Sequence, residues 1–240
     1  MDNQLTNAYI INAIKSLIDD LGVKESVNHD EIIKLIYRQQ IKDAIYVIAR
    51  QLGLPIKINI SYVSKNYKSN DNNKFRSKAM SRVNRERSEE IIAQVAIPKD
   101  LPMFGSHELI NYKIDVKVSE NCCTYPETFI AVIAHELSHV LLYSLRHPEK
   151  ENEIYTDLVA NILGFSDVIS IGRKNEVEED LGYRINTLTT TYGYLTDEQF
   201  ELVNCKIKEI IEKYKTIINQ CVNQENKMEM LILHEYSGLL

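Results

Sequence analysis

Residues 126–146 read PETFIAVIAHELSHVLLYSLR, and this stretch decides the fold. It contains no glycine, its one proline stands at the start, and apolar residues flank the ionisable residues in its middle. Such a run predicts a buried helix from about Pro126 to about Arg146, with Pro148 just beyond its end. What has to be explained is why His135, Glu136 and His139 lie in the middle of an apolar helix.

These three residues form the pattern H-E-x-x-H. His135 and His139 are one helical turn apart on the same face, so they can bind one metal ion. Glu136 lies off that face but close enough to reach a water molecule on the metal. In a shuffled chain of this composition the pattern would occur by chance about 1% of the time. Burial of three ionisable groups is costly unless something pairs them, so we expect a metal site and not two core histidines.

A second stretch, residues 152–157, supplies carboxylates for the same site. Catalytic zinc usually has three protein ligands and one open position. Glu153 and Asp157 are four residues apart at the start of an expected apolar helix that ends at Gly164, so they share one face. We expect Glu153 to be the third ligand and Asp157 to accept a hydrogen bond from His135. The reverse assignment, with Asp157 as the ligand, ranks second.

Together, H-E-x-x-H and N-E-x-x-x-D resemble the motifs of the gluzincin zinc peptidases, of which thermolysin is the familiar member. The resemblance extends from Thr128 to Gly164. It implies a zincin-like core with one zinc ion per chain, bound by His135, His139 and Glu153. It also implies the remaining roles: Glu136 as the general base that activates a zinc-bound water, and Asp157 as the carboxylate that orients His135.

The chain departs from the larger gluzincins in one respect. Only thirteen residues separate His139 from Glu153, which is a shorter link than in thermolysin-like enzymes. This link suggests a small, compact member of the group in which a tight turn at residues 147–149 joins the two helices.

His147 is a competing ligand, because Pro148 permits a break that could turn it back towards the site. The metzincin spacing is absent, since Leu142 and Leu145 occupy the positions of its glycine and third histidine. Glu149 and Glu151 fit better as solvated acids near the start of the second helix. Cys122 and Cys123 precede the first helix closely, but their spacing does not support a role as ligands.

The function implied by the resemblance is that of a zinc-dependent metallopeptidase acting on a peptide or protein, with a dedicated intracellular protein as target. A second electrophile is usual at such sites. The candidates, among which the sequence does not select, are Tyr183, Tyr192, Tyr194, His107 and His234. The alternatives are hydrolysis of a small amide, or a non-catalytic or regulatory zinc-binding scaffold whose C-terminal helix binds a partner. A structural site would not need Glu136, which argues against the scaffold.

The composition is that of a globular protein, with 44% hydrophobic and 26% charged residues among 240. A net charge of −6 argues against nucleic acid as a partner. The N-terminus lacks a basic region and predicts an amphipathic helix, so neither a signal peptide nor a membrane partner is expected. Four cysteines without a C-x-x-C motif, two of them adjacent, favour a reduced, cytoplasmic location.

The expected fold class is α+β, with a zincin-like core of a small mixed sheet and two helices, and further helices packed around it. We expect an N-terminal helical segment at residues 1–54, the metallopeptidase core at 55–175 and a C-terminal long-helix segment at 176–240, integrated into one domain. The patterns predict helices at Asn3–Asp20 and Asp30–Leu52, and strands at Ile56–Val63, Ile91–Pro98 and Tyr112–Ser119. In the resemblance, the strand before the active helix lies at the sheet edge and pairs with substrate. Tyr112–Ser119 is the candidate, with an ordinary amphipathic strand as the equal alternative.

Two further segments are distinctive. Residues 64–90 contain eight Lys or Arg and four Asp or Glu, for a net charge of +4. A mobile loop or extended hairpin is favoured there over a flap on the cleft or a contact for an acidic partner. Thr196 and Gln199 form a capping box that begins a helix of about 35 residues. Its heptad stripe is Phe200, Val203, Ile207, Ile210, Tyr214, Ile217, Cys221, Gln224, Met228 and Leu231. Packing on the N-terminal helices is favoured over a homodimer or helical partner through residues 196–231.

Overall fold

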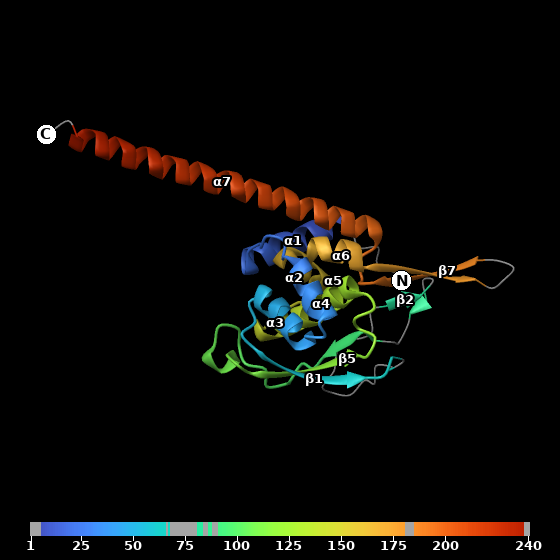
Figure 1. Ribbon diagram of the computed structural model, residues 1–240. Coiled ribbons are helices and arrows are strands. Elements are labelled where there is room, and N and C mark those ends of the chain that lie inside the picture. The colour runs from blue at the N-terminus through green and yellow to red at the C-terminus, as the bar shows by residue number, and fades with distance from the viewer. Residues whose placement is uncertain are drawn as a thin grey trace.

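The fold is mixed α+β, with helices packed around two small sheets (Figure 1). The computed structural model describes residues 6–65, 67, 81–83, 86–87, 91–180 and 185–237. The helices are α1 (Asn7–Leu21), α2 (His29–Tyr37), α3 (Ile41–Gln51), α4 (Pro126–Ser144), α5 (Glu153–Ala160), α6 (Ser166–Gly172) and α7 (Asp197–Ser237), with short turns η1 (His107–Leu109) and η2 (Asn161–Phe165). The strands are β1 (Lys57–Val63), β2 (Ser81–Val83), β3 (Glu86–Arg87), β4 (Ala93–Val95), β5 (Lys113–Ser119), β6 (Lys174–Asp180) and β7 (Ile185–Tyr192).

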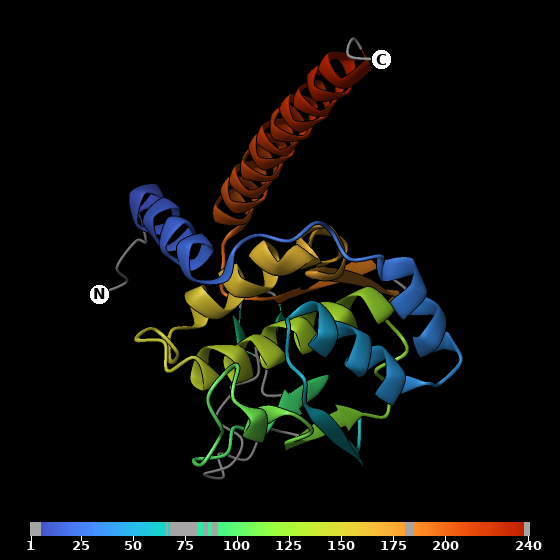
Figure 2. The ribbon, with the colours of Figure 1, turned by 90° about the vertical axis from the view of Figure 1, so that its left-hand side faces the viewer.

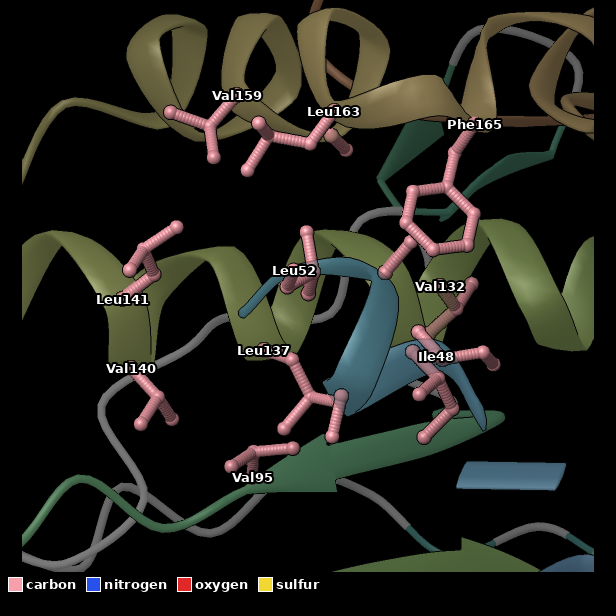
Figure 3. Packing of buried hydrophobic residues seen from close by; sticks show 14 of the residues in the cluster. Ile48, Leu52, Val95, Val132, Leu137, Val140, Leu141, Val159, Leu163 and Phe165 are labelled. Atoms are coloured by element: carbon pink, nitrogen blue, oxygen red, sulfur yellow. The ribbon is translucent and has the colours of Figure 1, made fainter. Parts of the chain in front are cut away.

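Helix α4 forms the centre of the molecule, as the apolar run predicts. Pro126 stands at its first turn, where its missing N–H costs nothing, and every residue from Thr128 to Ser144 is buried. In Figure 3, Leu137 points towards Val95 of β4, while Leu141 points towards the helix that carries Val159. A helix covered on all sides is apolar all round, so its few polar residues lie in the interior.

The sheet beneath α4 has the strand order β1-β5-β4. Strands β1 and β5 are parallel, with Ile58 opposite Ile114, and β4 is antiparallel to β5, with Val95 opposite Val116. Of the two equal interpretations of Tyr112–Ser119, the edge strand is therefore wrong, and the ordinary amphipathic strand is found. Strand β5 is buried along one face and has a hydrogen-bonded neighbour on each side, so no backbone edge is left for a substrate. The edge strand next to α4 is β4.

A second sheet, of order β3-β2-β7-β6, was not predicted. Strands β6 and β7 pair along their length as an antiparallel hairpin, and β2 joins it through the pairing of Ser81 with Tyr192. The basic segment 64–90 thus contains a short hairpin, β2–β3, while most of the segment lies outside the described residues. The sheet joins two parts of the chain about a hundred residues apart, so no local pattern indicates it.

The predicted helix Asp30–Leu52 is two helices, α2 and α3. Asn28 precedes the first residue of α2, but its side chain makes no capping hydrogen bond. The break comes at residues 38–40, where Gln39 has a φ of +58° and its N–H donates to the carbonyl of Ile36. The apolar period continues across this break because both helices pack on α4, so periodicity alone does not reveal it.

The helix carrying Glu153 bends sharply at Gly164 and resumes as α6. Gly164 has a φ of +102°, a conformation that favours glycine. The bend frees carbonyl groups for the segment between α1 and α2: Lys24 N–H donates to Ile162 at 3.0 Å and Val27 N–H to Gly164 at 2.9 Å. The expected end of the helix at Gly164 is a kink, and hydrogen bonds at this kink connect the N-terminal helices to the helix that carries Glu153.

Helix α7 begins at the predicted cap: Thr196 Oγ1 accepts from Gln199 N–H, and Gln199 Oε1 accepts from Thr196 N–H. Its first turns are buried through Phe200, Val203 and Ile207 and contact α1 and η2. Beyond these turns the helix extends away from the other elements, and Tyr214 and Ile217 are exposed (Figures 1 and 2). The first third of the heptad stripe therefore packs within the chain, as predicted. A partner for the rest stays a prediction.

The run Glu153–Gly172 is long and apolar enough to cross a membrane. However, 72% of its most apolar window is buried inside the molecule, which identifies it as a core helix pair. The cytoplasmic location stays a prediction.

The kink at Gly164 leads to a stability prediction. A Cβ atom there would lie 2.3 Å from the carbonyl oxygen of Glu25, whereas Gly22, with a φ of +71°, has open space around it. Gly164→Ala should lower the free energy of unfolding by about 2–4 kcal/mol, and Gly22→Ala by about 1 kcal/mol, since only backbone strain acts there. Urea unfolding with a chelator present measures both. Equal losses would show that the Glu25 backbone moves aside.

Candidate metal centre

Three side chains from α4 and α5 converge on one point. His135 and His139 are one turn apart on α4, with their ring centroids 4.9 Å apart. Glu153 is the first residue of α5, and its Oε2 lies 3.3 Å from His135 Nε2 and 3.1 Å from His139 Nε2. The ligand atoms of all three lie within 4.8 Å of one another. The structure thus brings together the three residues predicted as ligands into a group that could hold a metal ion.

The polar atoms at this point are buried and lack a hydrogen-bond partner. This holds for Nε2 of His135, Nε2 of His139 and Oε2 of Glu153, although the glutamate oxygen lies only 3.3 and 3.1 Å from the two nitrogens. In tetrahedral coordination with zinc bonds of about 2.0–2.1 Å, ligand atoms lie about 3.3 Å apart. The two distances to Glu153 match that spacing. The chemistry of these donors also fits zinc, which is commonly bound by imidazole and carboxylate.

The start of α5 is fixed so that Glu153 faces the histidines. Asn152 caps the helix, because its Oδ1 accepts from the N–H of Ile154 at 3.1 Å. Its Nδ2 donates to the hydroxyl of Tyr9 at 2.9 Å and to Glu149 at 3.0 Å, which ties the cap to α1 and to the preceding turn. A carboxylate in the first turn is also favoured by the helix dipole.

Each histidine has an outer partner on its second nitrogen. Asp157 Oδ1 lies 2.7 Å from Nδ1 of His135, as predicted. Thr156 Oγ1 lies 3.3 Å from Nδ1 of His139 and donates its own proton to the carbonyl of Asn152 at 3.2 Å, so it is an acceptor towards the ring. Both partners favour a proton on Nδ1 and leave the Nε2 lone pair for a metal.

Thr156 and the partners of Asp157 were missed by sequence reasoning. Thr156 could have been found, because it lies three residues after Glu153 and so shares its helix face. Asp157 Oδ2 accepts from the N–H groups of Tyr194 at 2.7 Å and Leu195 at 3.3 Å. Those residues follow the unpredicted hairpin, and no local signal connects them with the motif.

The electrostatics of the centre favour a cation. Burial opposes a charge on His135, but its contacts with Asp157 and Glu153 outweigh this effect and raise the pKa of His135 to about 10. Burial acts against a charged Glu153 as well, yet the two histidines hold the pKa of its carboxyl below its ordinary value. Two carboxylates around two imidazoles thus create a place for positive charge.

Glu136, the predicted general base, is buried beside the edge strand. Its Oε2 accepts the backbone N–H of Val95 at 3.0 Å. Glu136 follows His135 on α4, so it lies about 100° around the helix from that histidine, and its carboxylate contacts β4. A buried proton acceptor thus stands on the helix of the two histidines, at the side that meets β4.

The competing candidates lie elsewhere. His147 Nδ1 accepts from Glu149 N–H at 3.0 Å, and its Nε2 lies 3.6 Å from Asp20, so it is not part of the cluster. Cys122 and Cys123 are also not part of it. Among the candidate electrophiles, Tyr194 stacks on the His135 ring with centroids 5.9 Å apart, and Tyr192 lies on β7. His107 lies on η1, whereas Tyr183 and the side chain of His234 are outside the described residues.

The support from Thr156 can be tested with Thr156→Val. Loss of the acceptor on His139 Nδ1 should weaken zinc binding about tenfold, as is typical for outer partners of a ligand. Thr216→Val is the matched control, since that hydroxyl also donates to a carbonyl four residues earlier, but on an exposed part of α7. Competition with a chromogenic chelator measures the dissociation constants. Equal affinity of the two variants would exclude a role for Thr156 in orienting His139.

A comparison with protein-family models, curated proteins and solved structures found no match to this chain. The interpretation of the centre therefore depends on its geometry and chemistry.

Proposed function

We propose that the protein is a zinc-dependent metallopeptidase of the gluzincin type. The observation that carries the proposal is the convergence of two imidazole nitrogens and one carboxylate oxygen, all buried and without hydrogen-bond partners. Each histidine has an outer acceptor, and a further carboxylate, Glu136, lies on the same helix. Three ligands and a base are the set that metal-assisted hydrolysis of a peptide bond requires.

The roles of the residues follow from their positions. Zinc bound at the centre would lower the pKa of water and polarise the carbonyl to be cleaved. Glu136 takes a proton from the attacking water and passes it to the leaving nitrogen. Asp157 and Thr156 hold the two imidazoles in the tautomer that binds zinc.

The outer edge of the first sheet, formed by β4, is the candidate place for a peptide, and its three residues are buried before a peptide binds. β4 is the edge strand on the side of α4, and its Val95 N–H donates to Glu136. An extended peptide paired with β4 would therefore run past the base. Backbone pairing of this kind accepts many side chains, so the selectivity for an intracellular target would come from pockets or from surfaces elsewhere.

Two alternatives remain distinct from this proposal. Hydrolysis of a small amide would use the same residues but would not need the edge of β4. A non-catalytic or regulatory scaffold would use zinc to hold α4 and α5 together and α7 to bind a partner. The burial of Glu136 on the helix of the two histidines favours catalysis, because a structural zinc site gains nothing from a further ionisable group in the core.

Glu136→Gln separates catalysis from structure. The change keeps the size and the hydrogen bond from Val95 but removes the base, so peptide cleavage should fall about a thousandfold while one zinc per chain is retained. Glu127→Gln, in the first turn of the same helix, is the control and should leave both unchanged. Digestion of a peptide library with and without chelator measures activity, and elemental analysis measures zinc.

The outcomes distinguish the candidate functions. Wild-type protein without stoichiometric zinc would refute the metal centre. Zinc without cleavage of peptides or small amides would favour the scaffold, and cleavage of small amides alone would exclude the peptidase. An active Glu136→Gln variant would show that another group is the base.

A further inference from the structure

The turn formed by residues 193–195 holds Asp157 from the side opposite His135. The N–H groups of Tyr194 and Leu195 both donate to Asp157 Oδ2. Gly193 has a φ of +96°, and a Cβ atom there would lie 3.5 Å from the same oxygen. The turn thus packs directly on the carboxylate that orients His135.

This support is needed because the space beside Asp157 is not filled. A small cavity lies against His135 and Asp157, and Arg173 and Gly193 also line it. In a filled core, packing would fix the rotamer of the carboxylate, but here its hydrogen bonds must do so. The orientation of His135 therefore depends on what holds the turn in place.

Arg173 is the residue that holds the turn. Its Nη2 donates to the carbonyl of Leu195 at 2.8 Å, and its own carbonyl accepts from the N–H of Tyr192 at 2.8 Å. The side chain of Arg173 is 8% exposed, and its guanidinium lies 3.2 Å from Asp197 and 4.6 Å above the centre of the Phe200 ring. Asp197 and Phe200 belong to the first helical turn of α7, so Arg173 connects the start of that helix to the turn at residues 193–195.

We propose that Arg173 is a positioning residue for the metal centre, acting on His135 through the turn at 193–195 and Asp157. Through Arg173, the geometry of the centre also depends on the first turn of α7. This inference rests on the proposed metal site but not on peptidase activity. Arg173 is not a substrate-binding group, because its two terminal nitrogens face Leu195 and Asp197 and the side chain is buried.

Arg173 can hold the turn because its guanidinium presents two terminal nitrogens in one plane. One planar group satisfies the buried carbonyl of Leu195 and the carboxylate of Asp197 together. Without it, the carbonyl would be left buried and unsatisfied, and the turn would move towards water. The amides of Tyr194 and Leu195 would then leave Asp157, which has room to rotate, and His135 would lose its fixed tautomer.

The test compares Arg173→Met with Lys174→Met in the full chain. Lys174 is more exposed, and its ammonium also pairs with Asp197. It therefore controls for loss of charge beside Asp197. We expect Arg173→Met to raise the zinc dissociation constant about tenfold, within the range for outer-shell partners, and Lys174→Met to leave it unchanged. Chelator competition measures the constants.

A second measurement does not need zinc. Nitrogen NMR of the ring of His135 in metal-free protein reports whether its Nδ1–H is hydrogen-bonded to Asp157. Arg173→Met should change the His135 signals and leave those of His139, which is held by Thr156. A merely structural role of Arg173 would instead lower the unfolding midpoint and leave the hydrogen bond of His135 Nδ1–H to Asp157 as in the wild type.

Chemical rescue keeps the test decisive if Arg173→Met folds poorly. Arg173→Ala leaves a hole beside the existing cavity. Added ethylguanidinium should restore zinc affinity, whereas ethylammonium should not, because only the guanidinium has two terminal nitrogens for Leu195 and Asp197. Wild-type zinc affinity in Arg173→Met, or an equal loss in Lys174→Met, would overturn the inference. If the wild type binds no zinc, the proposed function fails, and the His135 spectra still decide whether Arg173 positions the ring.

Discussion

The structure depends on three polar atoms that are kept without protein partners. A buried nitrogen or oxygen usually finds a hydrogen bond, since an unsatisfied one costs about 1–3 kcal/mol. Here Nε2 of His135, Nε2 of His139 and Oε2 of Glu153 face one another, and none of them has a hydrogen-bond partner. A fold retains such a cluster only when other interactions hold each side chain in place. Most of the features around α4 can be understood as that support.

The support has a local and a remote part. The local part comes from α5: Asn152 caps the helix that presents Glu153, and Thr156, one turn later, accepts from His139. The remote part comes from the turn after β7, which holds Asp157 and thereby His135. Both outer partners lie on α5, but only Asp157, the partner of His135, is itself held by residues of the C-terminal third. On the proposal above, a change in that third should therefore affect His135 before His139.

The same division explains what could be predicted from the sequence. The helix of H-E-x-x-H, the placement of Glu153 and Asp157 and the cap at Thr196 follow from spacing within a few residues, and each is found in the structure. The order of the strands does not follow from spacing. Strand β5 alternates like an edge strand, yet β4 covers its other side, and only the three-dimensional pairing shows this. The pairing of β2 with β7 does not follow from spacing either, because the two strands are about a hundred residues apart in the chain.

The motif is therefore incomplete as a description of the centre. All residues of H-E-x-x-H and N-E-x-x-x-D lie before Gly164, and a chain that ended there would keep every candidate ligand and the base. It would lose the amides of Tyr194 and Leu195 and, with them, the only donors described for Asp157 Oδ2 in the part of the chain that the structure covers. Asp157 would then compete for the cation as a free carboxylate beside His135. The second sheet and the first turn of α7 therefore help to keep Asp157 an orienting group. Glu153 remains the carboxylate that faces both imidazole Nε2 atoms.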